Sequence, residues 1–121
     1  NSKEDFDRAI ALGLHDAETF NNRGLLNASL NRIDAALSDF RQATRIDPGY
    51  VDAYINQGLV HSSRNEFRLA FDAYTNALRT DPGSARAYFW RGMLLLSSGQ
   101  QDAGCRDLKT ASSLGWPPAP E

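Results

Sequence analysis

Residues 45–58, RIDPGYVDAYINQG, have a close counterpart in residues 79–92, RTDPGSARAYFWRG, which begin 34 positions further along the chain. Both stretches contain an Asp-Pro-Gly triplet followed at equal distances by a tyrosine and a glycine. The same shift aligns further columns of like residues: Gly24, Gly58 and Gly92; Phe20, Tyr54 and Tyr88; Ala36, Ala70 and Gly104; Phe40, Tyr74 and Leu108; Ala43, Ala77 and Ala111. Agreement at one fixed period indicates a repeat architecture.

Within each unit the apolar residues follow a helical period. Tyr54, Gly58 and His61 are spaced four and three apart, as on one face of a helix, and a second stripe begins at Phe67 after a polar break. The Asp-Pro-Gly triplet ends that second helix, because proline cannot continue a helix and disfavours helix in the residue before it. The pattern predicts helices over residues 17–29, 33–46, 51–63, 67–80, 85–98 and 101–113.

The repeated columns have steric roles. A glycine column in the first helix and alanine columns in the second allow the two helices of a unit to approach closely. The aromatic columns are expected to fill the space between neighbouring units. One such helix pair cannot bury both apolar stripes, so neighbouring units must stack.

These residues resemble the tetratricopeptide repeat family, whose 34-residue pattern contains an aromatic residue, a Leu-Gly pair, a Tyr, an Ala, a Phe and a Pro. The resemblance implies an all-α fold: a right-handed superhelical array of antiparallel helix hairpins, or α-solenoid. The sequence departs from the family pattern at the residue before each glycine, which is Arg23, Gln57 or Arg91 instead of Leu. The third unit also has Trp116 where the proline is expected.

The whole chain, residues 1–121, is predicted to form one domain of three full repeats, 17–50, 51–84 and 85–118, with a C-terminal tail at 116–121. Shifting back by one period turns Phe40 and Ala43 into Phe6 and Ala9. Residues 2–16 are therefore expected to form the second half of a preceding repeat, with a simple N-terminal capping helix as the alternative. The first residue is Asn rather than Met, which favours truncation from a longer array.

Composition excludes several classes of function. The 121 residues are 41% hydrophobic with a formal net charge of −2, and the basic residues form no column, so no nucleic-acid partner is expected. No apolar run is long enough to insert into a membrane as a helix. The single cysteine is compatible with a cytoplasmic location and does not exclude an exported or periplasmic protein.

No arrangement of residues predicts catalysis, a metal site or a cofactor. His15 is expected to be a solvated loop residue, whereas His61 and Cys105 stand in packing columns and are expected to be buried. The carboxylates Asp34, Asp39, Asp72 and Asp107 are expected on solvated helix faces. The protein is therefore predicted not to be an enzyme.

The resemblance places a ligand peptide in the concave groove, which the first helix of each unit lines. An asparagine column there carries amide donors and acceptors for a peptide backbone, aromatic and aliphatic side chains supply anchors, and an arginine could pair with a carboxylate. The predicted groove residues are Asn22, Asn56, Trp90, Phe89, Ile55, Leu59, Met93 and Arg86.

Two functions follow from this architecture. The first is a non-catalytic protein–protein interaction scaffold that binds a peptide or partner segment in the groove. The second is a self-association module of a larger protein, in which uncapped repeat ends stack into a homo-oligomer. A special case in the family, the clamp for a C-terminal Glu-Glu-Val-Asp peptide, is not expected, because Trp90 stands where a basic residue is needed.

Overall fold

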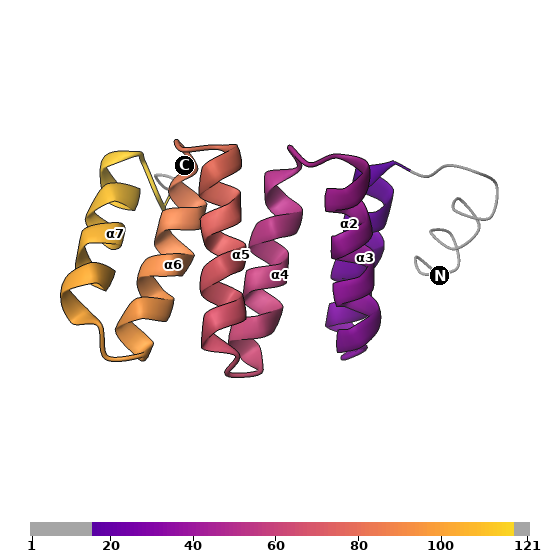
Figure 1. Ribbon diagram of the computed structural model, residues 1–121, viewed down its shortest axis with the longest axis horizontal. Coiled ribbons are helices and arrows are strands. Elements are labelled where there is room, and N and C mark those ends of the chain that lie inside the picture. Colours follow the sequence, from indigo (N-terminus) through magenta and orange to yellow (C-terminus); the bar gives the residue numbers. More distant parts are fainter. Residues whose placement is uncertain (1–15, 118–121) are drawn as a thin grey trace.

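The structure is a computed structural model that describes residues 16–117, and within this range it is all helical, with no strand. Six helices pair into three antiparallel hairpins that stand side by side (Figure 1). The helices are α2 (Ala17–Ser29), α3 (Ile33–Ile46), α4 (Val51–Ser63), α5 (Phe67–Thr80), α6 (Ala85–Ser97) and α7 (Gln101–Ser113). The predicted bounds are confirmed, except that α6 ends one residue earlier. The half repeat predicted for residues 2–16 lies outside the described residues apart from Asp16.

The turn inside each hairpin has one residue in the left-handed conformation, at the same position in all three repeats. Asn31, Asn65 and Gly99 occupy this position with φ values of 61°, 60° and 88°. In each turn the next backbone N–H donates to a carbonyl five residues earlier in the first helix, at 2.8–2.9 Å. This hydrogen bond closes the helix end, and only glycine or a short polar residue adopts the required φ readily.

The turns between hairpins are fixed by the aspartate of each Asp-Pro-Gly triplet. The Asp47 carboxylate accepts a hydrogen bond from the Gly49 N–H at 2.9 Å, and Asp81 accepts one from Gly83 at 3.0 Å. The proline in the middle stops the preceding helix. The two triplets therefore reverse the chain in the same way, which places successive hairpins in equivalent positions.

Close packing inside a hairpin depends on glycine opposite an aromatic ring. A Cβ atom added to Gly24 would lie 2.5 Å from Cε1 of Phe40, and one added to Gly58 would lie 2.3 Å from Cε1 of Tyr74. Both rings are buried and face Ala residues that have no exposed surface. The predicted steric role of the glycine column is confirmed in these two hairpins.

The third hairpin reaches the same closeness with different residues. Here Gly92 of α6 faces Gly104 of α7, and a Cβ added to Gly104 would lie 2.9 Å from the Gly92 carbonyl oxygen. Leu108 replaces the aromatic ring and lies against Gly92. The loss of the aromatic residue is thus accompanied by a second glycine, which lets the backbones themselves approach.

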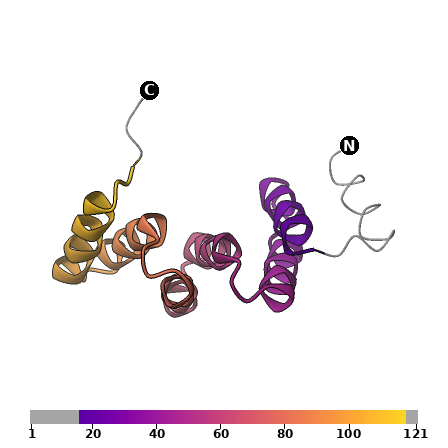
Figure 2. The same ribbon diagram turned by 90° about the horizontal axis from the view of Figure 1, so that it is seen from above.

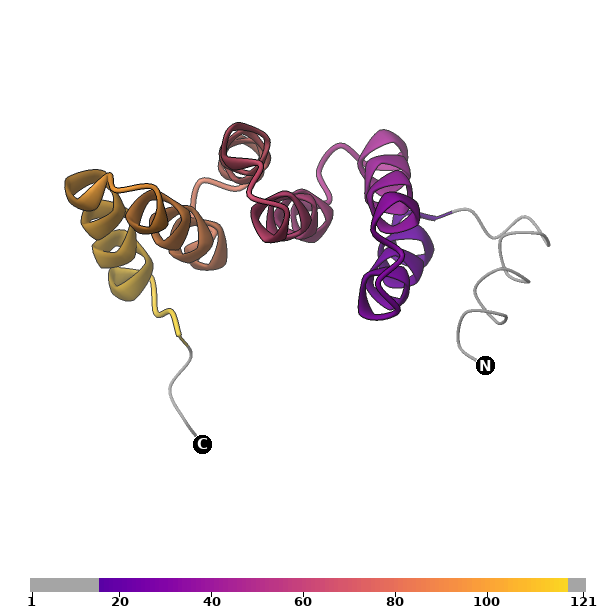
Figure 3. The ribbon, with the colours of Figure 1, turned by 90° about the horizontal axis from the view of Figure 1, so that it is seen from below.

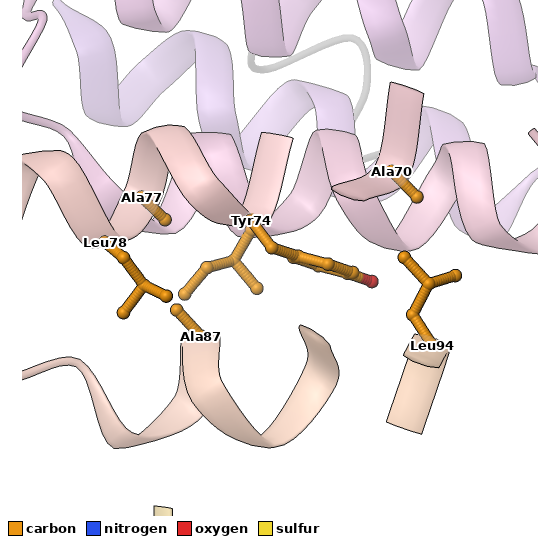
Figure 4. Packing of buried hydrophobic residues seen from close by; sticks show 7 residues of the cluster. Ala70, Tyr74, Ala77, Leu78, Ala87 and Leu94 are labelled. Carbon is orange, nitrogen blue, oxygen red and sulfur yellow. The ribbon is translucent and has the colours of Figure 1, made fainter. Parts of the chain in front are cut away.

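The largest buried cluster lies between the second and third hairpins. Tyr74 and Leu78 of α5 pack against Ala87 and Leu94 of α6 (Figure 4). Burial raises the pKa of the Tyr74 hydroxyl well above its ordinary value, because the buried site disfavours the charged phenolate. Each aromatic ring therefore joins the two helices of its own hairpin and also supports the next hairpin, as predicted.

The array is curved because its two sides pack differently. Backbones of neighbouring first helices approach one another, α2 with α4 and α4 with α6. Among the described residues, neighbouring second helices make no such approach, either α3 with α5 or α5 with α7. The first helices therefore line the inner side of the arc that is visible when the helices are viewed end-on (Figures 2 and 3).

Two carboxylates expected in solvent are buried in ion pairs. Asp39, only 3% exposed, accepts hydrogen bonds from Arg23 at 2.7 and 3.0 Å and from Asn27 at 2.9 Å. Asp107 is likewise buried and accepts two hydrogen bonds from Arg91, at 2.7 and 3.1 Å. The prediction for these two aspartates was wrong, because it ignored the arginine that faces each of them from the first helix of the same hairpin. Asp34 and Asp72 are exposed as predicted.

The central hairpin has no such ion pair. At the equivalent positions it carries Gln57 and Ala73, and the Gln57 side chain donates instead to the Phe40 backbone carbonyl at 3.4 Å. Arginine and aspartate thus occur together in the first and third repeats and are replaced together in the second.

Two further packing predictions have different outcomes. His61 is buried, and its Nδ1 lies 3.1 Å from a Glu66 carboxylate oxygen. Cys105 is exposed, contrary to prediction, because no described helix packs against the outer face of α7. His15 lies outside the described residues.

Substituting Gly58 with alanine tests the hairpin geometry. Alanine favours a helix interior by about 1 kcal/mol relative to glycine, so an open site would be stabilised. We expect Gly58→Ala instead to lower the free energy of unfolding by about 1–3 kcal/mol, since its Cβ overlaps the Tyr74 ring. Urea unfolding followed by circular dichroism measures this change. Gly83→Ala, where the nearest atom lies 3.6 Å away, is the control and should have little effect.

The buried ion pair can be tested with residues taken from the chain's own second repeat. Asp39→Ala should lower the free energy of unfolding by about 3 kcal/mol, because it leaves Arg23 without its buried carboxylate. The double variant Arg23→Gln/Asp39→Ala reproduces Gln57 and Ala73 and should lose less than the single variant. A double variant that loses as much as the sum of the Asp39→Ala and Arg23→Gln single variants, measured by urea unfolding, would show that the pair is not coupled.

Candidate peptide-binding groove

An apolar column runs along the inner side of the array. It consists of Leu25 of α2, Leu59 of α4 and Met93 of α6, which stand at equivalent positions of the three repeats. Leu25 is 45% exposed and Met93 44% exposed, whereas Leu59 is half-buried. The three side chains stand in register, one in each repeat, and present apolar surface to a ligand.

A hollow of about 310 Å³ opens beside this column between α4 and α6. Leu59, Trp90 and Met93 form its apolar wall, and Tyr74 lies at its base. Ser62, Ser63 and Ser97 contribute polar groups to its edge. Three of the predicted groove residues are therefore brought together around a concave space, the usual form of a site for an apolar anchor.

Phe89 is held in a cluster of three aromatic rings. Its ring centroid lies 5.1 Å from that of Trp90 in an edge-to-face arrangement and 5.9 Å from that of Trp116. Trp116, from the segment after α7, thus packs against the start of α6. Phe89, predicted to line the groove, is therefore half-buried against Trp116.

The two predicted asparagines have different environments. Asn56 is 4% exposed, and its Nδ2 donates to Oδ1 of Asn21 in the preceding repeat at 2.9 Å. The expectation that this amide faces a ligand was wrong, because it joins α2 to α4. Asn22 is half-buried, and its side chain has no hydrogen bond to another described residue, so its donor and acceptor remain available.

Ile55 also lies beneath the groove and not in it. It is 1% exposed and packs in the cluster that contains Ala70 and Tyr74. Its repeat equivalents are the buried Asn21 and the half-buried Phe89. Asn21 and Ile55 face the next first helix, which covers them, so Ile55 supports the groove from below.

Charges on the inner side are mostly acidic near α2 and α4. Arg86, predicted to bind a ligand carboxylate, already has its Nη1 3.3 Å from an oxygen of Asp52 in the preceding repeat. Burial and the charges of Glu18 and Asp52 raise the pKa of Tyr50. An exposed ion pair contributes little, so Arg86 can still exchange its partner, but it is no longer an unopposed positive charge.

Among residues 16–117, no group of three or more His, Cys, Asp or Glu side chains is placed to hold a metal ion. No helix in the same range combines the length and apolarity needed to cross a membrane.

Comparison with known families identifies the fold. Two models described as tetratricopeptide repeat match residues 17–50 and 55–104, which together make up more than half of the chain. The chain belongs to the tetratricopeptide repeat family. A search of curated proteins found no significant match.

Solved structures show the same arrangement. Two crystal structures of MamA match with TM-scores of 0.85 and 0.83 at 28% and 26% identity, covering 93% and 98% of this chain. A crystal structure of YrrB, described as a TPR protein with an unusual peptide-binding site, matches the fold with a TM-score of 0.78 at 19% identity over 93% of the chain. The chain spans 66% and 68% of the two MamA chains and 58% of YrrB.

Proposed function

We propose that this protein is a non-catalytic protein–protein interaction scaffold that binds a segment of a partner in the inner groove. The observation that carries the proposal is the apolar column of Leu25, Leu59 and Met93, exposed at Leu25 and Met93, beside the hollow at Trp90. Tetratricopeptide repeat proteins generally bind peptides or other proteins. In such interfaces, a few aromatic and aliphatic anchors supply most of the binding free energy.

The repeat spacing constrains the partner. Packed helices lie about 8–10 Å apart, so the members of the apolar column are separated by a similar distance. An extended segment in the polyproline II conformation rises about 3.1 Å per residue with three residues per turn, so every third side chain would meet the column. A helical segment rises 1.5 Å per residue and would meet it with residues about six or seven apart.

The polar groups of the groove favour one orientation of a bound segment. Asn22 offers an amide donor and acceptor near α2, where it can hydrogen-bond an exposed peptide backbone. Glu18 and Asp52 are exposed on the same half of the inner side. A partner segment with basic residues at this end and apolar residues toward Trp90 would match the groove.

Affinity capture with matched variants tests the proposal. Met93→Asp and Trp90→Ala alter the groove, and we expect both to abolish capture of a partner that the unaltered protein retains. Leu69→Asp is the control, because Leu69 is exposed to a similar extent, 48%, but belongs to the second helix of its hairpin. Capture that survives both groove variants but is lost with Leu69→Asp would place the binding surface elsewhere.

The groove should not bind a C-terminal Glu-Glu-Val-Asp peptide tightly. Capture of its carboxylates needs several unopposed basic side chains, whereas Arg86 is paired with Asp52 and Asn56 is buried. We expect isothermal titration calorimetry to show no low-micromolar binding of this peptide. Low-micromolar affinity would contradict the geometry assigned to the inner side.

The alternative function, self-association by stacking of repeat ends, has less support at α7. Leu78 of α5 packs against the next hairpin, but its equivalent in α7 is the exposed Ser112. The half-buried Phe71 is likewise replaced by the exposed Cys105. A polar outer face of this kind is typical of a helix that closes an array. Self-association stays a prediction, and sedimentation velocity of the unaltered protein over a range of micromolar concentrations would detect an oligomer.

A further inference from the structure

A larger hollow lies on the other side of α6 from the groove. It has a volume of about 440 Å³ and is walled by Phe67 and Phe71 of α5, Leu95 of α6 and Ala103 of α7. The two phenylalanine rings are stacked, with centroids 6.2 Å apart, and both are partly exposed. The space therefore offers a wall of apolar surface that is already in place.

The hollow follows from the packing of the second helices. The backbones of α5 and α7 do not approach each other within the described range, so α6 forms the floor between them. At the position of Ala103, the preceding repeat carries Leu69. A small residue at the wall of an open gap leaves room that a leucine would occupy.

The base of the hollow is formed by Arg91, whose positive charge is paired with Asp107. The Arg91 guanidinium lies 5.5 Å from the ring centroid of Phe71 and 5.6 Å from that of Tyr88. A further hydrogen bond, 3.4 Å long, joins Arg91 to Thr75 of α5. These contacts hold Arg91 in one geometry, so a ligand meets a preformed floor.

The rim carries an unmatched positive charge. Arg106 lines the hollow, is exposed, and forms no ion pair with another residue in the described part of the chain. The hollow thus combines apolar walls with one available guanidinium at its edge. The complementary group is a large apolar side chain with a carboxylate close beside it.

We propose that this outer hollow is a second binding site, which takes a partner-protein segment containing an aromatic or large aliphatic residue next to an aspartate or glutamate. A volume of about 440 Å³ lies within the range of sites that enclose such groups. The groove uses Trp90 and Met93 of α6, whereas the outer hollow uses Arg91 and Leu95. The two sites are separate, so one molecule can bind two segments at once.

A nuclear magnetic resonance titration of the ¹⁵N-labelled full chain tests this site. The probe is a short synthetic peptide with a single phenylalanine between two aspartates in a serine–glycine background. A second peptide with lysines in place of the aspartates is the charge control. We expect the acidic peptide to shift the amide signals of Leu95, Ala103 and Arg106, and the lysine peptide to shift them far less.

Two variants and one control locate the interaction. Ala103→Leu, which copies Leu69 of the preceding repeat, should weaken binding by at least about tenfold because its side chain fills the hollow. Arg106→Glu changes only an exposed residue and should weaken binding about fivefold or more at low salt, with a smaller effect at high salt. Trp90→Ala should leave the affinity unchanged, since it belongs to the groove.

The outcomes separate this site from the groove. Shifts confined to residues around Trp90, loss of binding in Trp90→Ala, or no shifts at millimolar peptide would each overturn the outer site while leaving the groove proposal untouched. Unchanged affinity in both Ala103→Leu and Arg106→Glu would overturn it as well. Thermal unfolding of each variant verifies that the fold is retained.

Discussion

Contact between a glycine of the first helix and an aromatic ring of the second determines the geometry of the first two hairpins. Because Gly24 and Gly58 have no Cβ, the rings of Phe40 and Tyr74 can approach the backbone of the first helix closely. Tyr74 also belongs to the cluster that supports α6, so the same ring sets the distance between neighbouring hairpins. The position of every inner side chain depends on this contact, because the apolar column is in register only if successive hairpins stack equivalently.

Electrostatic contacts refine this steric framework at both ends of the array. Each of the buried carboxylates of Asp39 and Asp107 accepts two hydrogen bonds from its arginine, and these bonds offset part of the large cost of removing charges from water. Arg91 additionally contacts Thr75 and Phe71 of the preceding hairpin. A single side chain thus joins three helices, and it also lines the outer hollow.

The sequence predicted the helices closely because each repeated column reports the same constraint several times. It predicted the site less well, since a column shows where a residue lies on its helix but not how far the next helix covers it. Ile55 and Asn56 became buried for this reason. The burial of Asp39 and Asp107 could have been predicted, because each occurs with an arginine in its own repeat and both partners change in the second repeat. The outer hollow was not predictable, since it depends on the distance between α5 and α7.

The unequal packing of the two sides gives the array a mechanical property. First helices touch their neighbours along the inner edge and are linked there by the Asn21–Asn56 hydrogen bond, whereas the second helices are separated by gaps. Any bending about the inner edge would open or close the outer gaps, because neighbouring second helices make no direct backbone approach there. A segment lodged between α5 and α7 would therefore act as a wedge that holds the arc at one radius.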